Sequence, residues 1–243
     1  IFLSPWNYPF QLALNPLVGA LAAGNTAIVK PSSSSPHVAK VIADILSSVF
    51  PAEYVATVLG SASEAEALLY EKVDYIFFTG SIPVGRKVMQ IAANHLVPVT
   101  LELGGKSPAI IDRGIDLKLA AKRIAFGKLM NAGQTCIAPD YVLIHPDDKK
   151  AFIGYYQEAV ELFYGANPLK NDAYPKIVNQ KHVTRLLQLM ENETIALGGG
   201  HLGSKIAPTL LDNITFESPI MQEEIFGPIL PLVSYESIDQ LMR

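Results

Sequence analysis

A single cysteine lies where a nucleophile could act. Cys136 is the only cysteine of the chain, and it follows Gly133-Gln134-Thr135 just beyond the end of an apolar helical pattern. A thiolate on such a loop, held by a rigid scaffold, could attack an electrophilic carbon. A lone cysteine can equally be a buried structural residue, and no histidine lies near Cys136 in the sequence.

Two further residues could supply the base and the oxyanion donor that a thiol nucleophile needs. Glu102 lies inside an apolar run that ends at Gly104-Gly105. A carboxylate there is costly to bury, and partial burial raises the pKa of a glutamate toward that of a general base. The alternative is a glutamate that faces solvent. Asn7, between Trp6 and Tyr8, could donate its amide to an oxyanion or could be an ordinary turn residue.

Three segments could bind a phosphate or a sugar. The run GSIPVG, residues 80–85, joins a strand pattern to a helix pattern, where glycine and a helix N-terminus favour a phosphate. It is not GxGxxG, so a plain strand–helix turn is the alternative. Lys30 could reach a ribose or phosphate, or be a solvated surface lysine. Glu223-Glu224, before Phe226, could hold a sugar hydroxyl or lie in a plain loop.

The first hundred residues alternate short apolar runs with helical patterns. Strands are predicted at residues 26–30, 54–59, 73–79 and 98–103. One helix is predicted to start at Ser35 as N-cap with Pro36 in the first position. Another is predicted with Val84, Val88 and Ile91 on one face. This alternation predicts a mostly parallel sheet with helices on both faces.

The pattern changes after Gly105. Strands are predicted at residues 109–111, 141–144 and 229–235, and helices at 117–131, 149–164 and 182–192. We therefore place a domain boundary near residue 105 in an α/β protein, with domains at residues 1–105 and 106–243.

Composition excludes several classes of function. The chain has 243 residues, a net charge of −4 and scattered charges, so we expect no nucleic-acid partner. Its five histidines lie far apart, so we expect no metal site. One cysteine allows no internal disulfide and fits a reducing, cytoplasmic setting. The mean hydropathy is +0.25, but polar residues break the longest apolar stretch, residues 12–29. We therefore expect buried core there and no membrane segment in this chain.

The two ends of the sequence resemble interior segments. The chain starts with Ile1-Phe2-Leu3, which is typical of the inside of a strand, and ends in what reads as the first turn of a helix. No signal-peptide pattern is visible. We expect a fragment of a longer protein.

Short motifs spread along the chain resemble one family. They are PWNYP (5–9), VKPS (29–32), FTGSIPVG (78–85), LELGGKSP (101–108), GQTC (133–136) and EEIFGP (223–228). In this order they resemble the aldehyde dehydrogenase superfamily. The stretch FGKLMNAGQTCIAPDY, residues 126–141, is most similar to the class 3 branch of fatty, aromatic and coniferyl aldehyde dehydrogenases. The resemblance implies part of a Rossmann-like NAD(P)-binding domain at residues 1–105, and a catalytic domain at 106–243 that is incomplete at its C-terminus.

The resemblance also implies a reaction, the oxidation of a small-molecule aldehyde to a carboxylate with NAD or NADP. Cys136 would attack the aldehyde, and the Asn7 amide and the Cys136 backbone N–H would hold the oxyanion. Oxidation of the thiohemiacetal would leave a thioester, which Glu102 would hydrolyse by activating water. Members of this branch lead us to expect a homodimer when the protein is full length.

Cofactor roles follow from the same motif positions. Lys30 would contact the adenosine ribose, and Glu224 the nicotinamide ribose, with Phe226 packed nearby. The residues expected at the pyrophosphate and nicotinamide are Gly80, Ser81 and Gly85. Many family members have an acid three residues after this lysine, where Ser33 stands here. A serine does not repel a 2′-phosphate, so we expect NADP to be used as well as NAD.

Alternatives within and outside this chemistry remain open. One is a CoA-acylating or semialdehyde-specific member of the superfamily, although an acylating enzyme needs no base such as Glu102. Another is a catalytically silent member, and a third is a fragment that only binds a dinucleotide. The presence of Cys136, Glu102 and Asn7 favours the hydrolytic enzyme.

Overall fold

The computed structural model describes residues 1–241, and the chain divides into two compact units, Ile1–Gly104 and Gly105–Arg243. The division falls between Gly104 and Gly105, which have no side chain that could pack into the core of either unit. The assignment of the first unit to the cofactor and of the second to catalysis stays a prediction.

A parallel sheet of five strands forms the centre of the first unit, in the order β3-β2-β1-β4-β5. The strands are β1 (Phe2–Leu3), β2 (Ala27–Lys30), β3 (Val55–Thr57), β4 (Ile76–Gly80) and β5 (Val99–Leu103). The helices are α1 (Pro9–Ala22), α2 (Pro36–Val49), α3 (Ala62–Leu68) and α4 (Ile82–Asn94). All four neighbouring pairs are parallel, which confirms the predicted Rossmann-like sheet.

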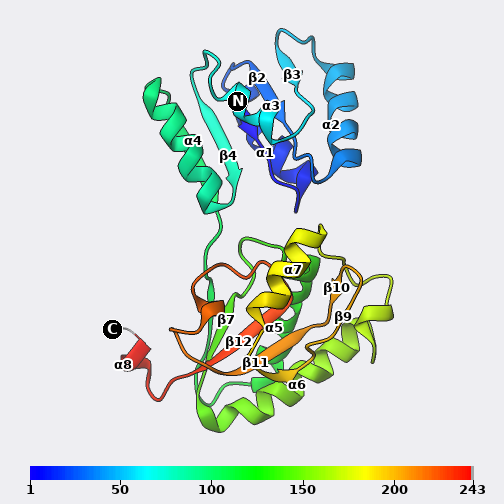
Figure 1. Cartoon of the computed structure of the whole chain (residues 1–243), viewed down its shortest axis with the longest axis vertical. Coiled ribbons are helices and arrows are strands. Elements are labelled where there is room, and N and C mark those ends of the chain that lie inside the picture. Colours follow the sequence, from blue (N-terminus) through cyan, green and yellow to red (C-terminus); the bar gives the residue numbers. More distant parts are fainter. Residues whose placement is uncertain (242–243) are drawn as a thin grey trace. The chain divides into compact units, whose positions relative to one another are not determined.

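Both faces of this sheet are covered. Phe2 packs with the cluster of α1, α2, β2 and β3, whereas the next residue, Leu3, packs with the cluster of β4 and α4. Successive side chains of a strand point to opposite faces, so β1 contributes to both cores. In Figure 1, α2 and α4 accordingly lie at opposite sides of the unit.

Some predicted features of this unit were wrong. The stretch at residues 12–29 is not a run of buried core: it contains most of α1, in which Ala13 and Leu17 are buried and Pro16 is tolerated. Ser35 precedes α2 as predicted, but its side chain does not cap the helix and instead donates to Ser32 O at 3.4 Å. Val84 is exposed, whereas Val88 and Ile91 are buried in the core below α4.

The helix α3 was not predicted from the sequence, although a capping box marks its start. Ser61 Oγ accepts from the backbone N–H of Ser63, while Glu64 accepts from the backbone N–H of Ser61, which together make a capping box. The hydrogen bond from the Ser61 hydroxyl is the main reason that the pKa of Glu64 falls to about 2. The S-x-x-E spacing predicts such a helix start, but the helix is too short to show an apolar period.

A second five-stranded sheet, in the order β6-β7-β12-β11-β8, forms the centre of the second unit. Its strands are β6 (Pro108–Ile111), β7 (Tyr141–Ile144), β8 (Thr194–Leu197), β11 (Thr209–Ile214) and β12 (Ile229–Ser234). All pairs are parallel except β8 with β11. The remaining elements are α5 (Leu117–Leu129), α6 (Pro146–Tyr164), α7 (Gln180–Leu189), α8 (Ile238–Leu241), η1 (Met130–Gly133), η2 (Pro168–Lys170), η3 (Pro219–Met221), β9 (His201–Leu202) and β10 (Lys205–Ile206).

Alternating side chains divide this unit into two cores. Val142 and Ile144 of β7 pack with α5 and α6, whereas Leu143 packs with α7 on the other face. Figure 1 shows α7 in front of the sheet. The α/β class is confirmed for both units, whereas β8 to β11 were not predicted.

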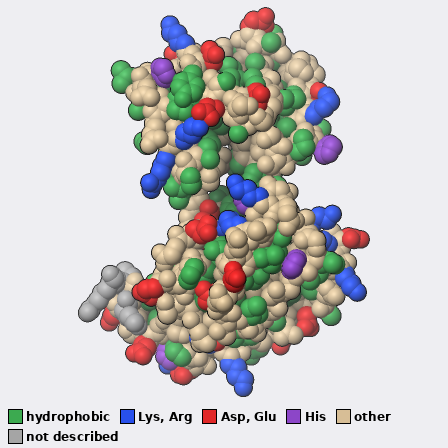
Figure 2. Space-filling view, viewed as in Figure 1, with side chains coloured by type: hydrophobic (Ala, Val, Ile, Leu, Met, Phe, Trp, Pro, Cys, Tyr) green, Lys and Arg blue, Asp and Glu red, His purple; other side chains and the backbone are tan. Residues whose placement is uncertain are grey.

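The surface of the described residues is mixed in charge. Figure 2 shows lysine, arginine, aspartate and glutamate side chains interspersed on the visible face. Within residues 1–241, no helix is both long and apolar enough to cross a membrane.

Candidate active site

The carboxyl edge of the first sheet collects most of the residues singled out in that unit. Asn7 lies in the bend between β1 and α1, Lys30 ends β2, and Gly80 ends β4. Because the strands are parallel, their carboxyl ends lie on one edge. The chain continues from β1 to β2 on one side, whereas β4 lies on the other side of β1. This reversal of strand order is the switch point where open α/β sheets bind ligands.

Lys30 is buried at this edge, which excludes the solvated surface lysine. Its side chain is 4% exposed, and Nζ donates to Pro31 O at 2.9 Å and to Gly60 O at 2.8 Å. Burial lowers the pKa of Lys30, and the charge of Glu64 opposes this effect. The ammonium group is thus fixed at the sheet edge by two backbone carbonyls, with a third N–H donor for a ligand.

Gly80 and Gly85, at the β4–α4 turn, have no Cβ, and neighbouring side chains of the protein occupy the space that a Cβ would need. A Cβ on Gly80 would lie 2.5 Å from Cζ of Phe78, and a Cβ on Gly85 would lie 2.7 Å from Cδ2 of Leu103. Gly85 therefore permits close packing of α4 on β5. Ser81 precedes α4 without capping it, so its hydroxyl makes no bond to the first turn of the helix.

Glu102 is exposed, so of the two alternatives left by the sequence the glutamate that faces solvent is correct. The reason is the position of β5 at the edge of the sheet. Leu103 faces α4, where it touches Gly85, and the side chain of Glu102 must point to the opposite face. Ser33 is also exposed, in the turn between β2 and α2.

In the second unit, Cys136 lies at the corner of a tight turn. The backbone N–H of Ala138 donates to Thr135 O at 3.0 Å, so Cys136 and Ile137 are the two central residues. Thr135 is buried, Cys136 is half-buried, and Ile137 is 81% exposed. The thiol is thus neither a core side chain nor a freely solvated one.

The backbone that leads into this turn is left-handed over three residues. The φ angles of Asn131, Ala132 and Gly133 are 50°, 52° and 74°. The helix predicted to reach Asn131 therefore ends at Leu129 and gives way to η1. A left-handed alanine costs about 1–2 kcal/mol, which surrounding contacts must compensate. A Cβ on Gly133 would lie only 2.2 Å from Gly227 O, so this glycine also allows residues 133 and 227 to pack backbone to backbone.

We expect Gly133→Ala to destabilise the second unit by more than about 2 kcal/mol, since it adds a left-handed alanine and a clash with a backbone oxygen. The control is Gly154→Ala in α6, where the added Cβ meets nothing within 4 Å. That change is expected to be neutral or to stabilise by up to ~1 kcal/mol. Urea unfolding of both variants measures the difference, and equal free energies of unfolding would contradict the account.

Gln134 fixes the turn to a distant segment. Its Nε2 donates to Asn131 O at 3.0 Å and to Lys176 O at 3.1 Å, and its Oε1 accepts from the backbone N–H of Val178 at 2.9 Å. The side chain is 2% exposed. This satisfied amide holds the loop before Cys136 against residues 176–178, a role that the sequence did not reveal.

The loop at residues 223–227 also belongs to the candidate site of the second unit, together with the turn of Cys136 and the side chain of Gln134. Arg185 of α7 donates to Glu224 O at 3.2 Å and to Ile225 O at 2.5 Å. Phe226 has a φ of 50°, which is strained for an aromatic residue. Desolvation raises the pKa of Glu224, whereas a hydrogen bond from the Gly105 backbone opposes this rise.

Lys128 is buried beneath these segments. It is 1% exposed, and desolvation lowers its pKa from 10.5 to about 8, although Asp140 and Glu224 favour the charged form. A folded-state pKa below the unfolded one means that the unfolded chain binds more protons between pH 8 and 10.5. Lys128 therefore contributes stability that increases with pH across this window, whereas the buried Tyr156 and Tyr174, whose pKa is raised, contribute the opposite trend at its upper end.

We expect Lys128 to contribute about 2 kcal/mol more to the free energy of unfolding at pH 10 than at pH 7. Lys128→Met should remove this contribution, whereas Lys150→Met, at an exposed position of α6, should keep it. Urea unfolding at several pH values gives the comparison. Parallel profiles for the protein and Lys128→Met would show that the buried lysine does not have the lowered pKa.

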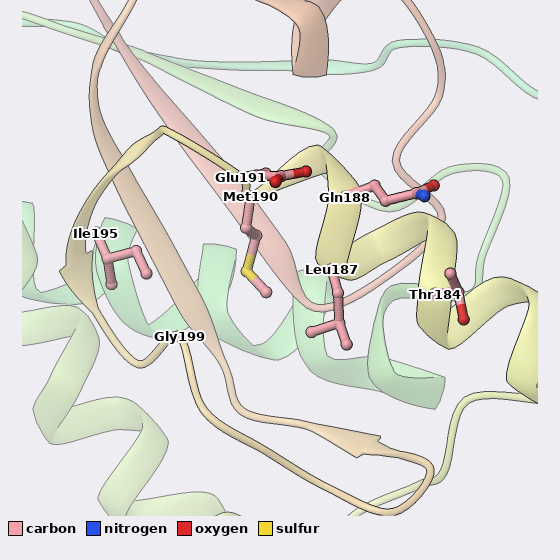
Figure 3. A pocket seen from close by; sticks show the side chains of 7 residues that line it. All are labelled: Thr184, Leu187, Gln188, Met190, Glu191, Ile195 and Gly199. Carbon is pink, nitrogen blue, oxygen red and sulfur yellow. The ribbon is translucent and has the colours of Figure 1, made fainter.

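A separate groove lies between α7 and the segment that follows it, and it has a volume of about 390 Å³. Leu187 and Met190 project to the same side in Figure 3. Its lining residues are Thr184, Leu187, Gln188, Met190, Glu191, Ile195 and Gly199. None of them is a predicted site residue. Among residues 1–241, no three histidine, cysteine or acidic side chains gather as metal ligands.

The chain matches the aldehyde dehydrogenase family over residues 1–243. It is 48% identical to 4,4'-diaponeurosporen-aldehyde dehydrogenase of Staphylococcus aureus, covering 99% of this chain and 53% of that one. It is 47% identical to aldehyde dehydrogenase family 3 member A2 of Mus musculus, covering 100% and 51%. It is 42% identical to the dimeric NADP-preferring aldehyde dehydrogenase of Mus musculus, covering 100% and 54%.

Solved structures agree with the sequence relatives. The substrate-bound state of Staphylococcus aureus AldH matches with a TM-score of 0.94 and 48% identity, over 99% of this chain and 53% of that one. Mycobacterium tuberculosis aldehyde dehydrogenase in complex with NAD⁺ matches with a TM-score of 0.90 and 31% identity, over 99% and 53%. The chain spans about half the length of these relatives, and the family 3 relatives confirm the class 3-like resemblance. The chain belongs to the aldehyde dehydrogenase family.

Proposed function

We propose that the protein oxidises an aldehyde to a carboxylate with NAD or NADP, and that Cys136 is its nucleophile. The observation that supports this most is the placement of Cys136 at the corner of a turn. The three residues 131–133, which precede this turn, have left-handed backbone conformations, and the buried side-chain amide of Gln134 binds the backbone of Asn131. Strain of this kind persists where neighbours over-determine a site, and it is typical of active sites.

The first unit fits a dinucleotide at its carboxyl edge. Ser4 follows β1 and Thr57 ends β3, and their hydroxyls are buried without a hydrogen-bond partner within residues 1–241. Unpartnered hydroxyls at the carboxyl edge of a parallel sheet, with Ser4 next to the switch point, fit a polar ligand. Lys30, Ser33, Gly80, Ser81 and Gly85 would hold the cofactor from this unit, and Glu224 and Phe226 from the other. When bound, NAD or NADP accepts the hydride that the aldehyde loses.

The side chains of the protein perform the remaining steps. The Cys136 thiolate attacks the aldehyde carbon, and the Asn7 amide and the Cys136 backbone N–H stabilise the oxyanion. After oxidation, Glu102 removes a proton from water, which attacks the thioester and releases the carboxylate. The exposure of Glu102 is compatible with contact to water.

The function is tested with a panel of aldehydes and both cofactors on the protein. The panel includes fatty and aromatic aldehydes and the aldehyde named in the Staphylococcus aureus relative. A burst of NADH or NADPH equal to the enzyme concentration, followed by release of carboxylate, is the expected result. Formation of an acyl-CoA when CoA is added would favour the acylating alternative, and binding without turnover would favour a silent member.

We propose that Ser33 permits the use of NADP. A carboxylate at this position would repel a 2′-phosphate, whereas the exposed serine does not. The relative described as NADP-preferring supports this choice. We expect Ser33→Glu to lower kcat/KM for NADP by about tenfold, with little change for NAD. Strict NAD preference before any substitution would exclude this role of Ser33.

We further propose a cytoplasmic homodimer. One relative is described as dimeric, and the single cysteine fits a reducing compartment. Light scattering of the protein measures the oligomeric state directly.

A further inference from the structure

The loop at residues 223–227 is attached through its backbone to a partly buried ion pair. Lys106 Nζ donates to Glu223 O at 2.9 Å and to Ile220 O at 3.2 Å. The backbone N–H of Ile225 donates to Asp140 Oδ1 at 2.9 Å. Lys106 and Asp140 form an ion pair at 2.5 Å, and the side chain of Asp140 is 4% exposed. Together, the two residues bind backbone groups on both sides of Glu224.

Asp140 also belongs to the segment of the nucleophile. It lies four residues after Cys136, and its backbone N–H donates to Ser107 O at 2.8 Å. The Asp140 carboxylate therefore contacts the loop at residues 223–227 and Lys106, and Asp140 itself follows the turn of Cys136 closely in the chain. The close approach of Gly133 to Gly227 is a second link between the same two segments.

The loop needs such attachment. Phe226 is left-handed, and Arg185 binds the carbonyls of Glu224 and Ile225 from α7. A strained residue keeps its conformation only where the contacts around it leave no alternative. The buried Lys128 adds positive charge near Asp140 and Glu224. If Lys106 is removed, Asp140 retains only part of its charge compensation, which is costly for a buried carboxylate.

We infer that the Lys106–Asp140 pair is a positioning device that holds the loop at residues 223–227 in register with Cys136. Neither residue touches the reacting atoms; they act through the backbone of the loop. The inference rests on the proposed function, because that function assigns Glu224 and Phe226 to the cofactor. Loss of the pair should displace both residues relative to the thiol.

The test compares Asp140→Asn and Lys106→Met with Asp212→Asn and Lys149→Met. Lys149 and Asp212 form an ion pair of similar length, 2.6 Å, that is also partly buried in the same unit. Breaking either pair should lower the melting temperature. Only the variants of Lys106 and Asp140 should lower kcat/KM for the cofactor, by about tenfold to a hundredfold, since small displacements of reacting groups have large effects. The controls should stay within about twofold.

A second readout separates positioning from general destabilisation. Iodoacetamide should alkylate the half-buried Cys136, and in the unmodified protein NADP should change the rate of alkylation. In Asp140→Asn and Lys106→Met this effect of NADP should be lost, whereas Asp212→Asn should keep it. The double variant Asp140→Asn/Lys106→Met should be less than additive with the single variants.

The inference is overturned if the variants of Lys106 and Asp140 match the controls in kcat/KM and in the effect of NADP on alkylation. If Asp140→Asn does not fold, Lys106→Met decides, because it leaves Asp140 bound to Ile225. If the unmodified protein oxidises no aldehyde, the proposed function fails, and the alkylation measurement still decides whether the pair links the loop to the thiol.

Discussion

Cys136→Ser is expected to lower kcat for aldehyde oxidation by about a thousandfold or more. A hydroxyl must lose its proton to a base before it attacks, whereas a thiol is partly ionised near neutral pH. Within residues 1–241, no hydrogen bond joins Cys136 to a histidine that could serve a serine in this way. The turn itself tolerates serine, so the loss would lie in the chemistry.

Stopped-flow measurement of NADH or NADPH formation checks this prediction. The burst seen in the unmodified protein should disappear in Cys136→Ser, while binding of the cofactor, followed by its fluorescence, should remain. Ile137→Val, at the exposed neighbour in the same turn, should keep the burst. A burst of normal amplitude in Cys136→Ser would mean that another group attacks the aldehyde.

Glu102→Gln is expected to lower the steady-state rate by about two to four orders of magnitude and to leave the burst in place. A glutamine amide cannot accept a proton from water, so the thioester forms at its usual rate and is hydrolysed slowly. Because Glu102 is exposed on the edge strand, we expect this substitution to leave the free energy of unfolding nearly unchanged. Glu71→Gln, at an exposed glutamate of the same unit, should keep both phases.

Equal loss of burst and steady state in Glu102→Gln would place Glu102 in the first half of the reaction. A normal steady-state rate would assign the hydrolysis to another base. Quenched-flow measurement of carboxylate release, alongside cofactor reduction, distinguishes these outcomes because it follows the second half of the reaction by itself.

The sequence predicted the features that depend on local pattern. The strand at residues 141–144 has the predicted bounds, and α2 begins after Ser35 as expected. The position of Cys136 on a loop after α5 was also predicted from the sequence. Each of these signals, the spacing of apolar residues, the turn residues and the short motifs, is formed by residues that are close together in the sequence. A single sequence is therefore enough to detect them.

Features set by contacts between distant residues could not be predicted. The sequence left open whether Glu102 is partly buried or faces solvent, because its exposure follows from the edge position of β5, which depends on the order of all five strands. The close approach of Gly133 to Gly227 and the attachment of Ile225 to Asp140 both join residues that are far apart in the sequence. Lys106 and Asp140 lie in the family motifs at residues 101–108 and 126–141. No local sequence pattern predicts that they form an ion pair or that they bind the loop at residues 223–227.

The central claim, a thioester on Cys136, can be measured directly. Glu102→Gln is mixed with an aldehyde and the preferred cofactor, quenched in acid and digested, and the peptides are analysed by mass spectrometry. The account predicts an added acyl mass on the peptide that contains Cys136, present only when both aldehyde and cofactor are supplied. An unmodified Cys136 peptide after a full burst of cofactor reduction would contradict it.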